Sequence, residues 1–112
     1  MLEITFFKRT YLYGFEASGH ASFAVEGEDI VCAAASALLQ STLLGLKKIL
    51  KISGRTKIKK GYLLFILNEG LSQVKIEKSQ LLLETLYESL KEIKKQYPKY
   101  IKIKTRRHNG RL

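Results

Sequence analysis

The sequence has no tryptophan, one cysteine and one proline among its 112 residues. The single cysteine, Cys32, excludes an internal disulfide and fits a reducing compartment, so we expect a cytoplasmic protein. No linker rich in proline, glycine or serine divides the chain, and its length is that of one ordinary domain. We therefore expect residues 1–112 to form a single domain.

Long hydrophobic runs are also missing. No run reaches about 18 uninterrupted apolar residues, which predicts that no helix spans a membrane. The start, MLEITFFKRTYLYGFE, does not have the basic region and long apolar run of a secretory signal peptide. Apolar residues make up 46% and charged residues 27%, which is typical of a globular rather than a disordered chain.

Positive charge is absent from one stretch of a very basic chain. The net charge is +10, yet no lysine or arginine lies between Arg9 and Lys47, where four acidic residues occur. The rest of the chain therefore carries +14 (10 plus 4), concentrated in residues 47–60 and 91–112. A basic balance of this size favours a polyanionic partner, most often nucleic acid. Any such contact is expected outside the acidic stretch.

Hydrophobic periodicity predicts five strands and two helices. The strands are expected at residues 2–9, 11–18, 56–60, 62–69 and 100–105. One helix is expected from its N-cap Asp29 to about Lys48, and another over residues 80–96, capped by Ser79 and stopped by Pro98. Residues 70–78 are ambiguous, and residues 106–112 are expected to be a flexible basic tail. The order ββαββαβ predicts an α+β fold whose mixed or antiparallel sheet has two helices packed on one face.

The apolar stripe of the first helix bears on the place of Cys32. Counting from the expected cap, the core stripe comprises Ile30, Ala33, Ala34, Ala37, Leu38 and Ser41. Cys32 falls on the other side, with Ser36, Leu39 and Leu43. That side of the first helix and Leu81–Leu83 on the second helix are apolar. We expect one copy of the chain to leave this apolar surface exposed to water. We therefore expect a homodimer.

Cys32 and His20 are candidates for thiol catalysis. In the first turn of a helix, free backbone N–H groups and the helix dipole favour a thiolate, and the same N–H groups can hold an oxyanion. His20, in a loop with Gly19 and Gly27 as hinges, can act as its base. A small buried cysteine and a solvated histidine are the alternative for the same residues. The spacing of Cys32, His20 and His108 is not that of a zinc site, so no metal or cofactor is expected.

A longer motif surrounds these two residues. It runs Gly19-His20-Ala21, then Gly27, then Asp29-Ile30-Val31-Cys32-Ala33-Ala34, then Ser36. This motif resembles the ribosomal-processing cysteine protease family of bacteria, and the closing YPKY segment is similar too. The resemblance implies that Cys32 is the nucleophile and His20 the base. Asp29 and Ser36 fall on the accompanying polar positions of the motif.

Two of these positions keep alternatives. Asp29 can support the site or only cap the helix, and Ser36 can orient His20, bond the substrate backbone or fill space. The resemblance further implies an endopeptidase that removes a short N-terminal extension from a large-subunit ribosomal protein precursor. The alternative is a non-enzymatic, ribosome-associated RNA-binding module. Against a dedicated module, the sequence contains no recognisable RNP aromatic signature and no zinc knuckle.

Overall fold

The computed structural model describes residues 1–19 and 26–108. Its elements, in chain order, are β1 (Leu2–Lys8), β2 (Leu12–Ser18), α1 (Glu26–Leu44), the π-helical turn η1 (Gly45–Ile49), β3 (Gly54–Lys59), β4 (Tyr62–Leu67), α2 (Gln73–Gln96) and β5 (Ile101–Arg107). Since η1 continues α1 without a break, this order is the predicted ββαββαβ.

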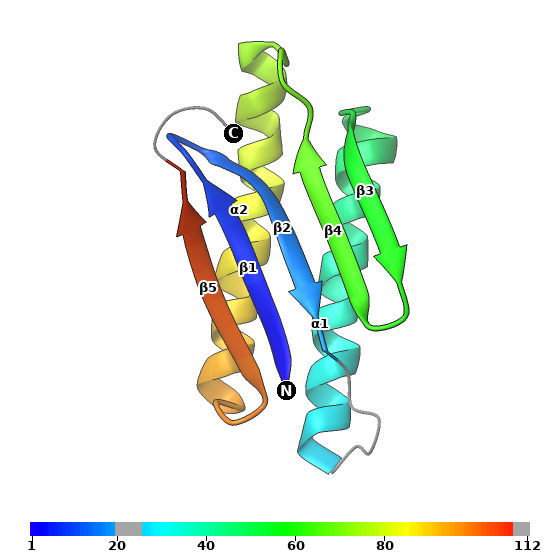
Figure 1. Cartoon of the computed structure of the whole chain (residues 1–112), viewed down its shortest axis with the longest axis vertical. Coiled ribbons are helices and arrows are strands. Elements are labelled where there is room, and N and C mark those ends of the chain that lie inside the picture. The colour runs from blue at the N-terminus through cyan, green and yellow to red at the C-terminus, as the bar shows by residue number, and fades with distance from the viewer. Residues whose placement is uncertain (20–25, 109–112) are drawn as a thin grey trace.

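The five strands form one mixed sheet in the order β3-β4-β2-β1-β5. β1 pairs antiparallel with β2 and parallel with β5, while β4 pairs antiparallel with both β2 and β3. The parallel pair requires a crossover, which α2 provides. Both helices lie on the same face of the sheet (Figure 1). The predicted fold class is confirmed.

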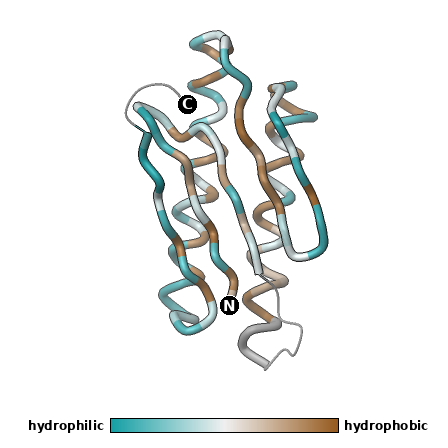
Figure 2. Tube along the Cα trace, in the orientation of Figure 1, coloured by the Kyte–Doolittle hydropathy of each residue, from teal (hydrophilic) through white to brown (hydrophobic). Residues whose placement is uncertain are grey.

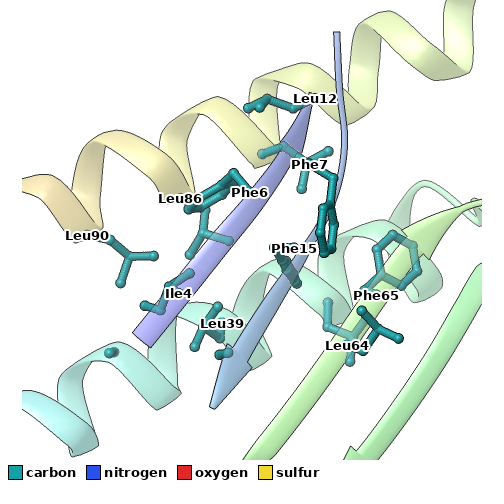
Figure 3. Packing of buried hydrophobic residues seen from close by; sticks show 14 of the residues in the cluster. Ile4, Phe6, Phe7, Leu12, Phe15, Leu39, Leu64, Phe65, Leu86 and Leu90 are labelled. Atoms are coloured by element: carbon teal, nitrogen blue, oxygen red, sulfur yellow. The ribbon is translucent and has the colours of Figure 1, made fainter. Parts of the chain in front are cut away.

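The core lies between the sheet and the two helices. Alternate residues of the central strands point into it, and Ile4, Phe6, Phe15 and Phe65 are completely buried. Figure 3 shows Ile4 and Phe6 facing Leu86 and Leu90 of α2. Each large apolar side chain buried in this way stabilises the fold by about 1.5–3 kcal/mol relative to leaving it exposed.

The boundaries and buried face of α1 differ from the prediction. The helix begins at Glu26, so Asp29 is its fourth residue and not its N-cap, and Gly27 lies inside the helix instead of bounding a loop. The buried residues are Val31, Ala35, Leu39, Thr42 and Leu43, not the predicted stripe. This face is buried because valine and leucine remove more apolar area from water than the alanines and serine of the predicted stripe.

The start of α2 also differs. The helix begins at Gln73, and the Lys75 backbone N–H donates to Oγ of the N-cap Ser72 at 3.2 Å. Ser79 is not a cap: it lies inside the helix, completely buried, and its hydroxyl donates to the Ile76 carbonyl oxygen at 2.6 Å. The unassigned residues 70–78 thus hold a turn, the cap and the first helical residues. As predicted, α2 ends just before Pro98.

The last strand is longer than predicted. β5 continues to Arg107, which pairs with Lys8 of β1, and the His108 backbone N–H donates to the Lys8 carbonyl oxygen at 2.9 Å. Arg106 and Arg107, placed in the predicted tail, therefore belong to the sheet. Each of these two residues pairs with a residue of β1. The tail was predicted from the charge of these residues, and charge does not show that β1 offers them a backbone partner. The end of the predicted tail, residues 109–112, lies outside the described residues.

One helical segment, Ile30–Ile49, is long and apolar enough to cross a membrane by length and composition alone, with a mean hydropathy of 1.5. Core helices of soluble proteins share these properties. Here Val31, Ala35, Leu39 and Leu46 of this segment are buried in the core. The segment is therefore weak evidence for a membrane span.

Candidate active site

Cys32 is half-buried on α1, as the seventh residue of the helix. At a rise of 1.5 Å per residue, it lies about 9 Å from the N-terminal end. The helix dipole acts mainly within the first turn, and the N–H groups without intrahelical acceptors are also found there. The predicted first-turn position is therefore wrong. The end of the helix therefore contributes little to any activation of the thiol.

The side of α1 that carries Cys32 lines a groove. Counting from Cys32, Ser36, Leu39 and Leu43 follow at steps of four, three and four residues, so the four share one side of the helix. Ser36, Leu39 and Leu43 line a groove of about 740 Å³ between α1 and the β3–β4 hairpin. Leu39 and Leu43 are buried, so this side of the helix faces the sheet. The sequence analysis predicted that it would point away from the core, and that prediction is wrong. Cys32 lies on this same side of α1, one turn closer to the start of the helix than Ser36.

The groove has an apolar interior and a basic rim. Its apolar lining includes Leu39, Leu43, Leu44, Ile58 and Leu63, and its basic residues are Lys47, Lys48 and Lys59. The Lys47 ammonium also donates to the Thr56 hydroxyl at 3.2 Å, which connects η1 with β3. Such a lining suits the apolar side chains of an extended peptide.

Gly19 fixes the chain at one wall of the groove. Its φ is +102°, and a Cβ at this position would overlap the Met1 carbonyl oxygen, so only glycine fits. The Gly19 backbone N–H donates to the Gly61 carbonyl oxygen at 3.0 Å, and both glycines line the groove. Gly19, predicted as a hinge, is thus an anchor directly before His20. His20 itself lies outside the described residues.

Tyr62, which the sequence analysis did not single out, borders the groove at the start of β4, but by the strand register its side chain points to the opposite, open face of the sheet with Glu16. Its hydroxyl donates to Glu16 Oε2 at 2.6 Å. This hydrogen bond first, then burial and the charge of Glu16, raises the pKa of Tyr62 above 10.0. Gly61 and Leu63 were missed with it, because their place in the groove depends on the pairing of β4 with β2.

The remaining candidates do not add a metal centre. Among residues 1–19 and 26–108, no group of three or more His, Cys, Asp or Glu side chains could hold a metal ion. His108 packs beside the Tyr13 ring at 6.0 Å, outside the groove. Of the predicted site residues, the structure places Gly19 and Ser36 in the groove and Cys32 on the adjoining turn.

Residues 1–102 match the family model of cysteine protease Prp. The chain belongs to the Prp family. Ribosomal processing cysteine protease Prp of Bacillus subtilis (strain 168) is 32% identical over 100 residues, covering 84% of this chain and 86% of that protein. The predicted resemblance and enzyme class are confirmed: the chain is a cysteine-type peptidase. This family membership argues against the alternative that the chain is a non-enzymatic RNA-binding module.

Solved structures show the same fold. Essential ribosomal processing protease Prp from Staphylococcus aureus, in complex with a substrate peptide, superposes with a TM-score of 0.82 at 21% identity, over 95% of this chain and 100% of that one. A crystal structure from Streptococcus mutans gives a TM-score of 0.78 at 27% identity, over 96% of each chain. The two-helix, five-stranded architecture is therefore shared by proteins of this fold.

Proposed function

We propose that this Prp-family protease removes a short N-terminal extension from a large-subunit ribosomal protein precursor, with Cys32 as nucleophile and His20 as base. One observation supports the assignment of Cys32 most strongly. A cysteine protease needs a cysteine thiol, the chain has a single cysteine, and that residue continues the groove-lining side of α1. His20 follows Gly19, which is anchored in the wall of the same groove.

The kind of substrate is proposed from the relatives and from the groove. The Bacillus subtilis relative is a ribosomal processing protease, and the Staphylococcus aureus relative was crystallised with a substrate peptide. The apolar groove suits the side chains of an extended peptide. In sequence, Glu26, Glu28 and Asp29 precede Cys32, and an acidic stretch attracts a basic ribosomal protein.

The proposed reaction runs through a thioester. The His20 imidazole takes the Cys32 thiol proton as Sγ attacks the carbonyl carbon of the scissile peptide bond. The tetrahedral intermediate collapses, the C–N bond breaks, and His20 donates the proton to the new N-terminal amine of the ribosomal protein. Water, deprotonated by His20, then hydrolyses the thioester between Cys32 and the extension. This step releases a carboxylate and restores the thiol.

Ser36 and Asp29 are proposed to support the pair. Ser36 is exposed in the groove one turn after Cys32, so its hydroxyl can bond the backbone of a bound peptide. Asp29 precedes Cys32 by three residues of α1, which is less than one helical turn. A carboxylate at that place can hold a protonated His20.

Incubation with the precursor ribosomal protein, followed by mass analysis of the products, tests the proposal. We expect one cleavage near the precursor N-terminus by the wild type and none by Cys32→Ala or His20→Ala, each with an unchanged circular dichroism spectrum. Ser36→Ala should raise KM, whereas Ser41→Ala, an exposed serine of α1 outside the groove, should not. Cleavage by Cys32→Ala at the wild-type rate would refute the assignment.

The proposal also includes location and assembly. A single cysteine fits the reducing cytoplasm, where ribosomal proteins are made. A homodimer through the helical layer is supported by its exposed apolar side chains, which are Ile30, Leu44, Ile49, Val74 and Leu81. Leu39, Leu43 and Leu83, from which a dimer was first predicted, are buried within one copy and no longer support it.

A further inference from the structure

The face of the sheet opposite the helices is open and has basic residues along both edges. The two edge strands are β3 and β5. Figure 2 shows hydrophilic residues recurring along both of them. Core residues such as Phe6 and Phe65 point toward the helices, so the alternate positions point away from them. By the strand registers, those outward positions hold Arg55, Lys57 and Lys59 on β3 and Lys102, Lys104 and Arg106 on β5. Lys59, at the end of β3, also borders the groove.

This set of six residues, here called the basic edges, carries one sign of charge. Neither edge strand contains an acidic residue. An ordinary solvated face mixes both signs, because like charges repel one another. Among residues 1–19 and 26–108, Arg55, Lys57, Lys59 and Lys102 have no ion-pair partner. Most of this charge is thus left for a polyanion to neutralise.

The carboxylates on the open face are already engaged. Glu3 accepts an ion pair from Lys104 at 3.5 Å. Glu16 accepts the hydroxyl proton of Tyr62, and Glu69 faces the Arg9 guanidinium at 3.7 Å. Only Glu3 pairs with one of the basic edges, Lys104, so these three carboxylates leave the six cations in excess, and none of the three lies on an edge strand.

The middle of the face has aromatic residues whose rings are covered. Phe7 and Tyr13 stack at 5.8 Å, and only 7% and 4% of their surfaces are exposed. The Arg106 guanidinium lies 5.7 Å from the Phe7 ring centre, and that of Arg9 lies 5.2 Å from the Tyr13 ring centre. A nucleobase therefore has no free Phe7 or Tyr13 ring on which to stack. What the face offers a nucleic acid is charge.

The shape of the face agrees with this. A shallow hollow of about 540 Å³ lies over Phe7 and Tyr13, with Arg55 at one side and Arg106 at the other. The two edges are four strand spacings apart in the sheet order, which is about 19 Å. Phosphates on either side of a bound helix can therefore meet cations at both edges.

We propose that the open face binds double-helical RNA through its phosphates, without reading sequence. Duplex RNA is recognised mainly by shape and by backbone contacts, whereas single strands are held by exposed aromatic rings, which the centre of this face does not offer. The groove of the candidate active site lies on the helix side of the sheet, between α1 and the β3–β4 hairpin. RNA and a peptide can therefore be bound at the same time.

Fluorescence anisotropy with two labelled RNA duplexes of about 16 base pairs and unrelated sequence tests this proposal. The full chain is compared with Arg55→Gln/Lys57→Gln/Lys102→Gln. The matched control, Lys75→Gln/Lys78→Gln/Lys94→Gln on α2, also lowers the net charge from +10 to +7 (10 minus 3). At low salt we expect the first variant to bind about tenfold more weakly or worse. The slope of log K against log salt should fall by about 2 to 3, since three phosphate contacts are lost.

The control variant should stay within about threefold of the wild type, and both duplexes should bind alike. Both variants should still cleave the precursor peptide, which separates this test from that of the protease. An equal loss in the two variants would overturn the proposal, as would a strong preference for one duplex or no wild-type binding at low salt. A changed oligomeric state with unchanged RNA affinity would assign the face to a second copy instead.

Discussion

Of the three glycines with positive φ angles in the described residues, Gly19 and Gly70 differ in what surrounds them. Gly19 has φ +102° and Gly70 has φ +78°, values that disfavour any residue with a Cβ. A Cβ at Gly19 would overlap the Met1 carbonyl oxygen, whereas one at Gly70 would meet no atom within 4 Å. Backbone strain is thus common to both positions, and steric overlap is added only at Gly19.

Alanine at these positions should separate the two effects. Gly70→Ala should lower the free energy of unfolding by about 1–2 kcal/mol, the cost of a left-handed residue. Gly19→Ala should lower it further, by about 1 kcal/mol or more, because β1 or the end of β2 has to move. Only Gly19→Ala should also slow precursor cleavage, since the segment carrying His20 leaves from this point. Urea unfolding measures the stability of the two variants, and a cleavage assay measures their activity. Equal losses of stability and of activity in the two variants would contradict the role of Gly19 as an anchor.

At the scale of whole elements, one side chain connects α2 with the start of β2. The Leu12 backbone N–H donates to Gln80 Oε1 at 2.9 Å, and Gln80 Nε2 donates to the Leu12 carbonyl oxygen at 2.8 Å. Leu12 is buried, and the β1–β2 register shifts between Phe7 and Lys8, next to it. Gln80 thus satisfies both backbone groups where the regular ladder is interrupted.

Gln80→Leu should therefore be costly. It leaves a buried N–H and a buried carbonyl without partners, which we expect to lower the free energy of unfolding by about 2 kcal/mol or more. Gln73→Leu, the same change at the exposed first residue of α2, should alter it by less than about 0.5 kcal/mol. Chemical denaturation gives both values, and faster amide exchange at Leu12 should accompany the larger loss. Similar values for the two variants would disprove this role of Gln80.

At the scale of the whole molecule, the two faces of the sheet have different surroundings. Five of the seven exposed large apolar side chains in the described residues lie on α1, η1 or α2, among them Ile49 and Leu81, while the basic edges border the open face. Apolar surface favours association with a second copy, and clustered positive charge favours a polyanion. The helical layer and the open face are therefore suited to different partners.

Light scattering at micromolar concentration should show a dimer. Ile49→Lys/Leu81→Lys should shift it toward monomer, because the exposed apolar surface of the helical layer would carry two new charges. Ser53→Lys/Gln73→Lys adds the same charge at two exposed polar positions and should leave the dimer intact. A wild-type monomer at micromolar concentration would contradict the proposed assembly.

The sequence by itself determined the features that depend on neighbouring residues. Local hydrophobic patterns, with period-two alternation in β1, located all five strands, and Pro98 located the end of α2, because pleat and proline geometry act over a few residues. The motif around Cys32 led to the protease family in the same way, since it lies within residues 19–36. The expected fold class followed from the order of these elements.

Only the tertiary structure decided which face of α1 is buried and where the helices begin. Stripes starting at Ile30 and at Val31 both have helical spacing, and packing against the sheet selected the one with more apolar area. Ser72 and Ser79 are both possible caps by residue type, and burial of Ser79 excluded the second. The groove beside Ser36 exists because β4 pairs with β2, a contact between segments more than forty residues apart. Local sequence does not carry that information, since long-range pairing is fixed by the burial of the whole core.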